Sequence, residues 1–266
     1  MRQPITAEQV MMMLLDETHF AALKSRLRIK AFADKLSEMC EDDSYDGLSF
    51  EEKMIILIET EVNSRDDKRI LANYKKAGFA SPAACMEDII YMPGRSLDRD
   101  RMERLTRCDY IRQADHLVII SESGSGKSFL AQALGNAACR SLFEVRYTRH
   151  ADMCMELNVA RTGGAVDYHR AMLDFISPAL LIIDDFFTTP ISDQNVIDTF
   201  EIVEARVDKG SMILASIIEP EEWHLRISTK TMADSLVDRI VQRAKFIDLR
   251  GPNMRKHLAQ DTIEKS

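Results

Sequence analysis

The stretch Ser-Glu-Ser-Gly-Ser-Gly-Lys-Ser at residues 121–128 decides the fold of this 266-residue chain. It follows a short apolar run, Leu117–Ile120, and precedes a helix-forming run, residues 129–134. The stretch matches the phosphate-binding pattern G-x-x-x-x-G-K-[ST], except that Ser121 stands in place of the first glycine. We therefore predict a nucleotide site whose contact residues are Ser123, Gly124, Ser125, Gly126, Lys127, Ser128 and Phe129.

Each residue type in this stretch has a chemical reason. Gly124 and Gly126 let the backbone turn so that its N–H groups face phosphates at a helix N-terminus. We expect Lys127 to reach the β- and γ-phosphates and the hydroxyl of Ser128 to coordinate Mg²⁺. The competing interpretation is a Gly/Ser surface turn that carries a solvated lysine.

A second element, Leu-Leu-Ile-Ile-Asp-Asp at residues 180–185, weakens that competing interpretation. Four apolar residues predict a buried strand, and ligands of parallel α/β sheets bind at the carboxyl ends of the strands. Asp184 is therefore a candidate magnesium ligand. Asp185 is placed to orient or deprotonate the attacking water. A strand that merely ends in two polar residues is the alternative.

The pattern of apolar residues along the chain predicts two regions. Five β-rich runs alternate with helical segments from residue 117 onward, which indicates a parallel sheet covered by helices on both faces; the runs are Leu117–Ile120, Phe143–Thr148, Leu180–Ile183, Met212–Ser216 and Lys245–Leu249. Residues 1–92 predict a small all-helical domain and residues 93–266 the α/β domain.

The helices of the first region have recognisable signals. Thr6 with Gln9 and Ser49 with Glu52 have the spacing of capping boxes. Apolar residues between positions 20 and 40 predict one amphipathic helix, and the helix opened by Ser49 should end at Gly78. Ser81-Pro82 predicts a further helix start.

Composition excludes several classes of protein. An apolar share of 45% and a charged share of 29% are typical of a globular protein, and no apolar stretch is long enough to span a membrane. We see no signal peptide and expect a cytoplasmic protein. The five cysteines are widely spaced without a C-x-x-C pair, so we expect reduced thiols.

The net charge of −8 argues against a protein that coats nucleic acid by bulk charge, so any DNA contact requires local patches. Two clusters of basic residues qualify, one near residue 27 and one near the end of the long predicted helix. A solvated helix face with ion pairs to neighbouring acids explains them equally well. The candidate DNA-contact residues are Lys24, Arg26, Arg28, Lys30, Lys68, Arg69, Lys75 and Lys76.

Three further residues are ambiguous on sequence alone. Ser216 ends a predicted strand and could sense the γ-phosphate, or it could be an ordinary strand-terminal serine. Arg239 lies on a predicted helix with inward-facing apolar neighbours, and Arg255 lies near the C-terminus. Either arginine could be a solvated surface residue.

The chain as a whole resembles the IstB-like family of AAA+ ATPases, the helpers of insertion-sequence transposition, which are related to DnaC-type helicase loaders. The resemblance rests on the two motifs above and on five further segments: residues 48–52 (LSFEE), Asp109-Tyr110-Ile111-Arg112, Pro220-Glu221-Glu222-Trp223-His224, residues 232–239 (MADSLVDR) and Met254-Arg255-Lys256. Of these, the Glu-Glu-Trp-His and Asp-Arg segments, in this order and at this spacing, are the more discriminating.

The resemblance implies an AAA+ core behind a helical N-terminal domain, with ATP and Mg²⁺ as cofactors. It also implies ATP-dependent self-assembly into a ring or spiral on duplex DNA and an IstA-type transposase as partner. By the same resemblance, Arg239 is the arginine finger that reaches a neighbouring subunit's γ-phosphate, and Arg255 is a sensor-2 arginine. We thus expect Lys127, Asp185, Arg239 and Ser216 to take part in ATP hydrolysis.

Three positions depart from the family pattern. Ser121 replaces a glycine, which would weaken ATP binding if that turn needs a positive φ. Phe187 stands where the family usually has glycine, and Ile217 follows Ser216 where an amide residue is usual. A helicase loader, a nucleotide-gated scaffold with little hydrolysis and a small-molecule kinase remain as alternatives, but the kinase leaves the Asp-Asp pair and Arg239 without a role.

Overall fold

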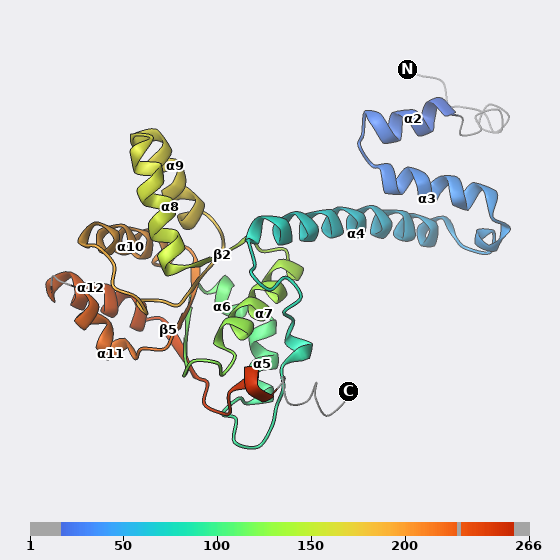
Figure 1. Ribbon diagram of the computed structural model, residues 1–266. Coiled ribbons are helices and arrows are strands. Elements are labelled where there is room, and N and C mark those ends of the chain that lie inside the picture. The colour runs from blue at the N-terminus through green and yellow to red at the C-terminus, as the bar shows by residue number, and fades with distance from the viewer. Residues whose placement is uncertain (1–16, 228–229, 258–266) are drawn as a thin grey trace. The chain divides into compact units, whose positions relative to one another are not determined.

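The chain divides into two units, Met1–Arg69 and Ile70–Ser266. The computed structural model describes residues 17–227 and 230–257 (Figure 1). The first unit is helical, and the second contains the sheet and most of the helices. The predicted boundary at residues 92 and 93 falls inside the second unit, because the chain from residue 70 onward already packs on the α/β core.

The second unit is built on a parallel five-stranded sheet, as the sequence predicts. Its strand order is β2-β3-β4-β1-β5. All four neighbouring pairs are parallel. The strands are β1 (His116–Ile120), β2 (Val145–Arg149), β3 (Leu180–Asp184), β4 (Ser211–Ser216) and β5 (Ala244–Asp248).

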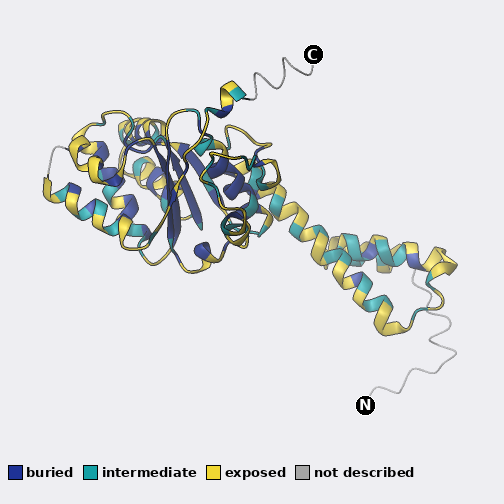
Figure 2. Ribbon diagram, turned by 90° about the horizontal axis from the view of Figure 1, so that it is seen from below, coloured by how far each residue is buried: buried dark blue, intermediate teal, exposed yellow. Residues whose placement is uncertain are grey.

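Helices cover both faces of the sheet (Figure 2). Alternate residues of a strand belong to two different cores, one on each face. Leu117 and Ile119 of β1 belong to the core beneath α7 (Lys127–Arg140). The helices α5 (Arg99–Thr106) and α6 (Asp109–Arg112) add residues to the same core. Val118 and Ile120 belong to the core on the other face. The helices of that face are α8 (His150–Thr162), α9 (Ala165–Ile176), α10 (Asp193–Arg206), α11 (Pro220–Trp223) and α12 (Lys230–Val241).

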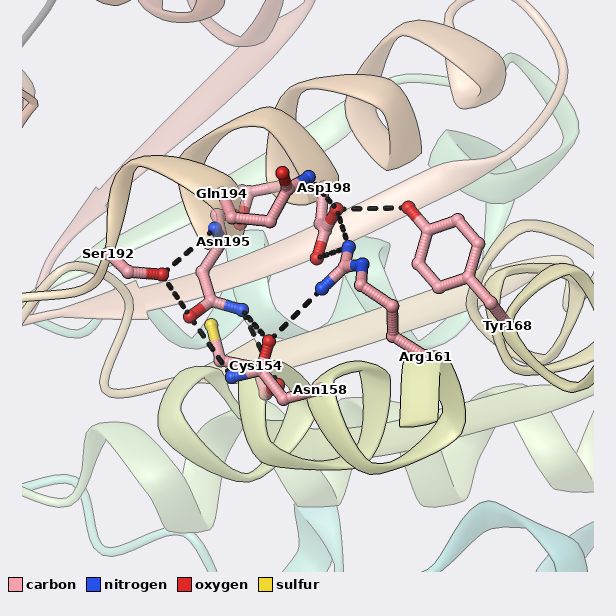
Figure 3. A network of polar contacts seen from close by, with 9 residues as sticks. Cys154, Asn158, Arg161, Tyr168, Ser192, Gln194, Asn195 and Asp198 are labelled. Carbon is pink, nitrogen blue, oxygen red and sulfur yellow. Dashed lines mark hydrogen bonds and ion pairs between the residues drawn. The ribbon is translucent and has the colours of Figure 1, made fainter. Parts of the chain in front are cut away.

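A polar network holds α8, α9 and α10 together (Figure 3). Asp198 of α10 is fully buried and accepts two hydrogen bonds from Nη2 of Arg161, at 2.7 and 2.8 Å. It also accepts a hydrogen bond from the Tyr168 hydroxyl at 2.9 Å. Asn195 donates to Asn158 at 3.1 Å and thereby joins α10 to α8 a second time. The buried carboxylate is therefore compensated by hydrogen-bonded partners on two other helices.

The segment that follows α4 (Phe50–Ala77) differs from its prediction. Gly78 ends α4 with a φ of 72°, as expected, but no helix begins at Ser81-Pro82. The backbone N–H of Ser81 donates to Gln132 at 2.7 Å, and Asn136 donates to the Ala84 carbonyl at 2.7 Å. Asn136 thus occupies the Ala84 carbonyl, which a helix would have paired with an N–H four residues on, and in this segment only the 3₁₀ turn η2 (Met86–Asp88) forms.

In the first unit, the single amphipathic helix predicted between residues 20 and 40 is two helices, α2 (Glu17–Ser25) and α3 (Lys30–Glu41). Arg28 has a φ of 56°, a left-handed conformation that no α-helix accommodates, so the chain turns between them. The 3₁₀ turn η1 (Asp43–Tyr45) then leads to α4.

The Ser49–Glu52 capping box is confirmed, because Ser49 N–H donates to the Glu52 carboxylate at 2.8 Å and Glu52 N–H donates to Ser49 Oγ at 3.2 Å. The Thr6–Gln9 capping box lies outside the described residues. In the described ranges, no helix is both long enough and apolar enough to cross a membrane.

The five cysteines are free thiols, and Cys108, Cys139 and Cys154 are buried. Burial raises the pKa of the Cys139 and Cys154 thiols to about 12, so both are protonated and contribute as small apolar side chains.

Two buried histidines make the stability of the second unit depend on pH. Burial lowers the pKa of both His116 and His150 to about 4. Nδ1 of His116 accepts the Met212 N–H at 3.2 Å, and Nδ1 of His150 accepts the Phe187 N–H at 3.1 Å, which requires both rings to be neutral.

We predict that the free energy of unfolding falls as the pH is lowered from about 6.5 to about 4, because the unfolded imidazoles take up protons that the folded ones exclude. Each ring contributes on the order of 3 kcal/mol at most over this window. Urea unfolding at several pH values should show a shallower pH dependence for His150→Gln. His169→Gln, at an exposed position of α9, is the matched control, and an equal slope in both variants would contradict the prediction.

Candidate active site

The phosphate loop connects β1 to α7 and has the backbone that its glycines predict. Gly124 and Gly126 have φ values of 87° and 99°, a left-handed conformation that glycine adopts without strain. Ser125 Oγ donates to the Glu122 carbonyl at 2.6 Å and closes the turn. Lys127 is the first residue of α7, so the free N–H groups of the first helical turn lie where an anion can bind.

The replacement of glycine by Ser121 carries no backbone cost. Ser121 has a negative φ, and its N–H donates to the Ser216 carbonyl at 3.1 Å, which continues the β1–β4 pairing by one residue. Ser121 therefore does not carry the steric strain that a positive φ would impose. The backbone gives no reason to expect that Ser121 weakens ATP binding.

The side chains of Lys127 and Asp185 meet across the loop. Lys127 Nζ lies 3.1 Å from Asp185 Oδ1, and Arg149 Nη2 lies 3.3 Å from Asp185 Oδ2. Sequence reasoning missed Arg149. Its position supplies a signal in retrospect, since it is the last residue of β2 and is paired in register with Asp184 of β3.

Asp184 is buried, with 2% of its surface exposed, and is held from two sides. Its Oδ2 accepts the Tyr147 hydroxyl at 3.0 Å, and its Oδ1 accepts the Asp185 N–H at 2.9 Å. Burial, reinforced by the negative charge of Asp184, raises the pKa of Tyr147, so the phenol remains a donor.

These oxygen donors fit magnesium. The carboxylate of Asp184 and the hydroxyl of Ser128 are hard oxygen ligands, and Mg²⁺ in nucleotide sites is held by few protein ligands together with phosphate oxygens and water. Among the described residues, no cluster of three or more His, Cys, Asp or Glu side chains forms an all-protein metal site. A site of the nucleotide-assisted type is the one that these residues can build.

The loop after β3 is held in a strained conformation by buried aromatic rings. Asp185 and Phe187 have φ values of 52° and 51°, unusual for residues other than glycine. His150 accepts the Phe187 N–H, and its Nε2 lies 3.1 Å from Thr199 Oγ1, whose proton is donated to the Asn195 carbonyl. His150 therefore carries its proton on Nε2.

Phe186 and Phe187 pack against this histidine and against Trp223. The Phe186 ring centroid lies 4.9 Å from both the His150 ring and the Trp223 ring. Both phenylalanines are fully buried. The packing compensates for the left-handed backbone at Phe187, where a glycine would adopt the same φ without strain.

Ser216 ends β4, as predicted, but its hydroxyl bonds to neighbouring backbone groups. Its hydroxyl donates to the Phe186 carbonyl at 2.8 Å, accepts the Ile218 N–H at 3.0 Å, and is fully buried. Both bonds hold backbone, which leaves the hydroxyl no proton for a γ-phosphate. The side chain that lines the adjacent cavity is Ile217.

Two cavities flank Lys127, which lines both. The smaller, about 150 Å³, is also lined by Ser123, Arg149 and Asp185. The larger, about 430 Å³, brings together most of the predicted nucleotide-binding residues: Gly124, Gly126, Lys127, Ser128, Phe129 and Arg255. Arg95, which sequence reasoning also missed, lines the larger cavity, and the Ser125 carbonyl accepts a hydrogen bond from it at 2.9 Å.

The C-terminal part of the described chain brings Arg255 to this cavity. The Met254 N–H donates to the Gly124 carbonyl at 2.8 Å, so a helical turn at residues 254–257 lies directly on the phosphate loop. Arg255 is thus placed beside the predicted nucleotide, although it is far from the loop in sequence.

Arg239 lies elsewhere in the second unit. It forms an ion pair with Glu204 of α10, donates to the Ser235 carbonyl at 3.1 Å, and its guanidinium lies 5.0 Å from the centroid of the Phe200 ring. None of these three partners lines either cavity, so one chain does not bring Arg239 to its own phosphate loop.

The candidate DNA-contact residues are all exposed. Lys24 pairs with Asp34 at 2.7 Å and Lys76 with Glu144 at 3.9 Å. The first unit carries Lys24, Arg26, Arg28, Lys30, Lys68 and Arg69, and the second carries Lys75 and Lys76.

Solved structures share the fold of about two thirds of this chain. DnaA from Aquifex aeolicus, bound to AMPPCP, has a TM-score of 0.55 and 20% identity over 70% of this chain and 56% of its own. DnaI has a TM-score of 0.53 and 16% identity over 65% of this chain and 91% of its own. At this identity the likeness shows the P-loop AAA+ fold alone.

Relatives with higher sequence identity cover most of the chain. An insertion sequence ATP-binding protein of Sinorhizobium fredii is 32% identical over 88% of this chain and 93% of its own length. The ATP-binding protein of insertion sequence IS1162 from Pseudomonas fluorescens is 30% identical over 74% and 85%. The family model described as IstB-like ATP binding protein matches residues 21–262. The chain therefore belongs to the IstB-like family of ATP-binding proteins, as its motifs predict.

Proposed function

We propose that this protein is an ATPase that assembles on duplex DNA as a homo-oligomer, in a ring or spiral, and recruits and stimulates an IstA-type transposase. The observation that carries the proposal is the ion pair between Lys127 and Asp185, 3.1 Å apart beside the phosphate loop. It brings together the predicted phosphate-binding lysine and the predicted base, and both side chains line the smaller cavity.

The residues of one chain divide the work of hydrolysis. The N–H groups of the loop and Lys127 bind and orient the phosphates of ATP. Asp185 accepts a proton from the attacking water, and Arg149 keeps the Asp185 carboxylate in place. Ser128 and Asp184 would hold Mg²⁺, which neutralises charge on the phosphates. Tyr147 fixes the orientation of the Asp184 carboxylate.

The remaining charge on the phosphates needs a further cation. Arg239 cannot supply it within its own chain, since its contacts lie on α10 and α12. Its side chain is 32% exposed, so it is accessible to a neighbouring subunit. We propose that it acts as the arginine finger of the adjacent active site.

The relatives support transposition as the setting, because those cited above are proteins of insertion sequences. The AAA+ fold is shared with DnaA and DnaI. The resemblance of the sequence to DnaC-type helicase loaders keeps a helicase loader as the second candidate. A scaffold that binds ATP and scarcely hydrolyses it is the third. A large transposase gene directly upstream would favour the helper over the loader.

Lys127→Ala should lower ATP turnover by about a hundredfold or more, because it removes charge stabilisation from the transition state. Asp185→Asn should abolish turnover, still bind ATP and trap assemblies on DNA, since the amide keeps the shape of the carboxylate but accepts no proton. Phosphate release with and without duplex DNA, together with sedimentation, measures both effects.

Asp174→Asn, at an exposed position of α9, is the control for Asp185→Asn and should retain wild-type turnover. Wild-type protein that binds ATP with no measurable turnover would replace the ATPase with the scaffold. An Asp185→Asn variant that hydrolyses ATP normally would refute the role of Asp185 as base.

A mixture of two inactive variants tests the shared site. Lys127→Ala and Arg239→Ala subunits, mixed in equal amounts, should recover about a quarter of wild-type turnover, because some interfaces then combine an intact lysine with an intact arginine. Arg243→Ala is the control for Arg239→Ala, because Arg243 has similar exposure and pairs with Asp208. Absence of any recovery would refute Arg239 as the arginine finger of a site shared between subunits.

The DNA contacts can be read from salt dependence. Replacing both Lys68 and Arg69 by alanine should weaken duplex binding and make the plot of log Kd against log salt shallower by about one unit per lost phosphate contact. Fluorescence anisotropy with ATP present measures the slope. Lys209→Ala, at an exposed site in the other unit, should leave the slope unchanged, and an unchanged slope in the double variant would exclude these two residues.

A further inference from the structure

Arg95 is a half-buried arginine that faces the phosphate loop. Its Nη1 donates to the Ile90 carbonyl at 2.6 Å, and its Nη2 donates to the Ser125 carbonyl at 2.9 Å. The side chain lines the cavity of about 430 Å³ together with Gly126 and Lys127. Arg95 thus places a cation beside the cavity face of the loop, and this cation is not part of the phosphate-binding motif.

The guanidinium of Arg95 is close to the point where the phosphate loop becomes a helix. A Cβ built on Gly126 would lie 3.0 Å from Arg95 Nη2. Gly126 is the N-cap of α7, so Nη2 lies beside the backbone N–H groups that are free at that helix start. An anion bound by those groups would come within reach of Arg95.

Among the described residues, the guanidinium of Arg95 forms no ion pair with an acid. Burial lowers its pKa, which marks a cation deprived of water without a counter-ion. Arg206 is the instructive contrast. Arg206 is fully buried, and its guanidinium donates hydrogen bonds to five backbone carbonyls, which makes it a structural arginine. The carbonyls are those of Phe175, Ile176, Pro178, Ala179 and Ser211.

The backbone around Arg95 is fixed in advance. Ser96 N–H donates to the Arg250 carbonyl at 3.0 Å, and Ser96 Oγ donates to the Asp248 carbonyl at 2.5 Å. A Cβ on Gly251 would lie 3.0–3.3 Å from Arg95 atoms, so the chain after β5 packs tightly against this residue. A guanidinium held in this way loses little further freedom when it binds a ligand.

We propose that Arg95 is a binding residue for the phosphate chain of the nucleotide, in addition to Lys127 and the loop. The proposal rests on the proposed function in one respect, namely that ATP occupies this loop. A guanidinium has five N–H donors, and two of its nitrogens already hold the Ile90 and Ser125 carbonyls. The remaining donors are available to phosphate oxygens, for which arginine is well suited.

The test compares ligands with and without phosphates. Binding of ATP, ADP and adenosine is measured by calorimetry for the wild type, Arg95→Gln, Arg95→Lys and Arg101→Gln. Arg101 is the matched control because it is also half-buried and donates to a backbone carbonyl, that of Phe246, yet does not line the cavity. Thermal unfolding without nucleotide is recorded for each variant.

We expect Arg95→Gln to weaken ATP and ADP binding by about tenfold or more, as for a lost charge-assisted hydrogen bond. Adenosine binding should be unchanged, Arg95→Lys should be intermediate, and Arg101→Gln should bind ATP like the wild type. The unliganded melting temperature of Arg95→Gln should match that of Arg101→Gln.

Equal weakening of all three ligands, with a lowered melting temperature, would overturn the proposal and make Arg95 a packing residue. If the wild type binds ATP and Arg95→Gln binds it equally well, the proposal for Arg95 is overturned while the proposed function stands. A wild type that binds no ATP would overturn the proposed function and this proposal together.

Discussion

The parallel register of three strands is the constraint on which the site depends. β4 lies between β1 and β3. The phosphate loop follows β1 and the Asp-Asp pair lies at the end of β3, so only one strand separates them. On the β1 side of β4, the Ser121 N–H donates to the Ser216 carbonyl. On the β3 side, the Phe186 N–H donates to the Ala215 carbonyl at 2.9 Å. The two polar loops are therefore anchored to the same strand end, which lets a lysine from one loop reach a carboxylate of the other.

Much of the fold and of the loop chemistry could be predicted, because both depend on local pattern. The apolar runs gave the strands to within one or two residues, and the Gly-Lys-Ser spacing located the cavity residues. The residues that escaped prediction contact the site from a distance in sequence. Arg95 lies in the segment before α5 and Arg149 at the end of β2. No spacing rule connects Arg95 to Ser125 or Arg149 to Asp185.

The errors of prediction also have physical causes. No helix forms at Ser81, where Asn136 of α7 occupies the Ala84 carbonyl and Gln132 fixes the Ser81 N–H. The break at Arg28 followed from one left-handed residue that carries no glycine signal. Ser216 lies at the end of β4 as predicted, but its rotamer turns the hydroxyl toward neighbouring backbone, and sequence does not encode that direction.

The left-handed backbone at Phe187 has a consequence for how this chain can change over time. A glycine there would relax the backbone but leave a hole between His150 and Trp223, whereas the present phenylalanine fills the space at a steric cost of about 1–3 kcal/mol. Neither residue is better in isolation, since each suits a different set of neighbours. Substitutions at positions 150, 187 and 223 should therefore be epistatic, so that the order in which they are acquired determines which sequences are accessible.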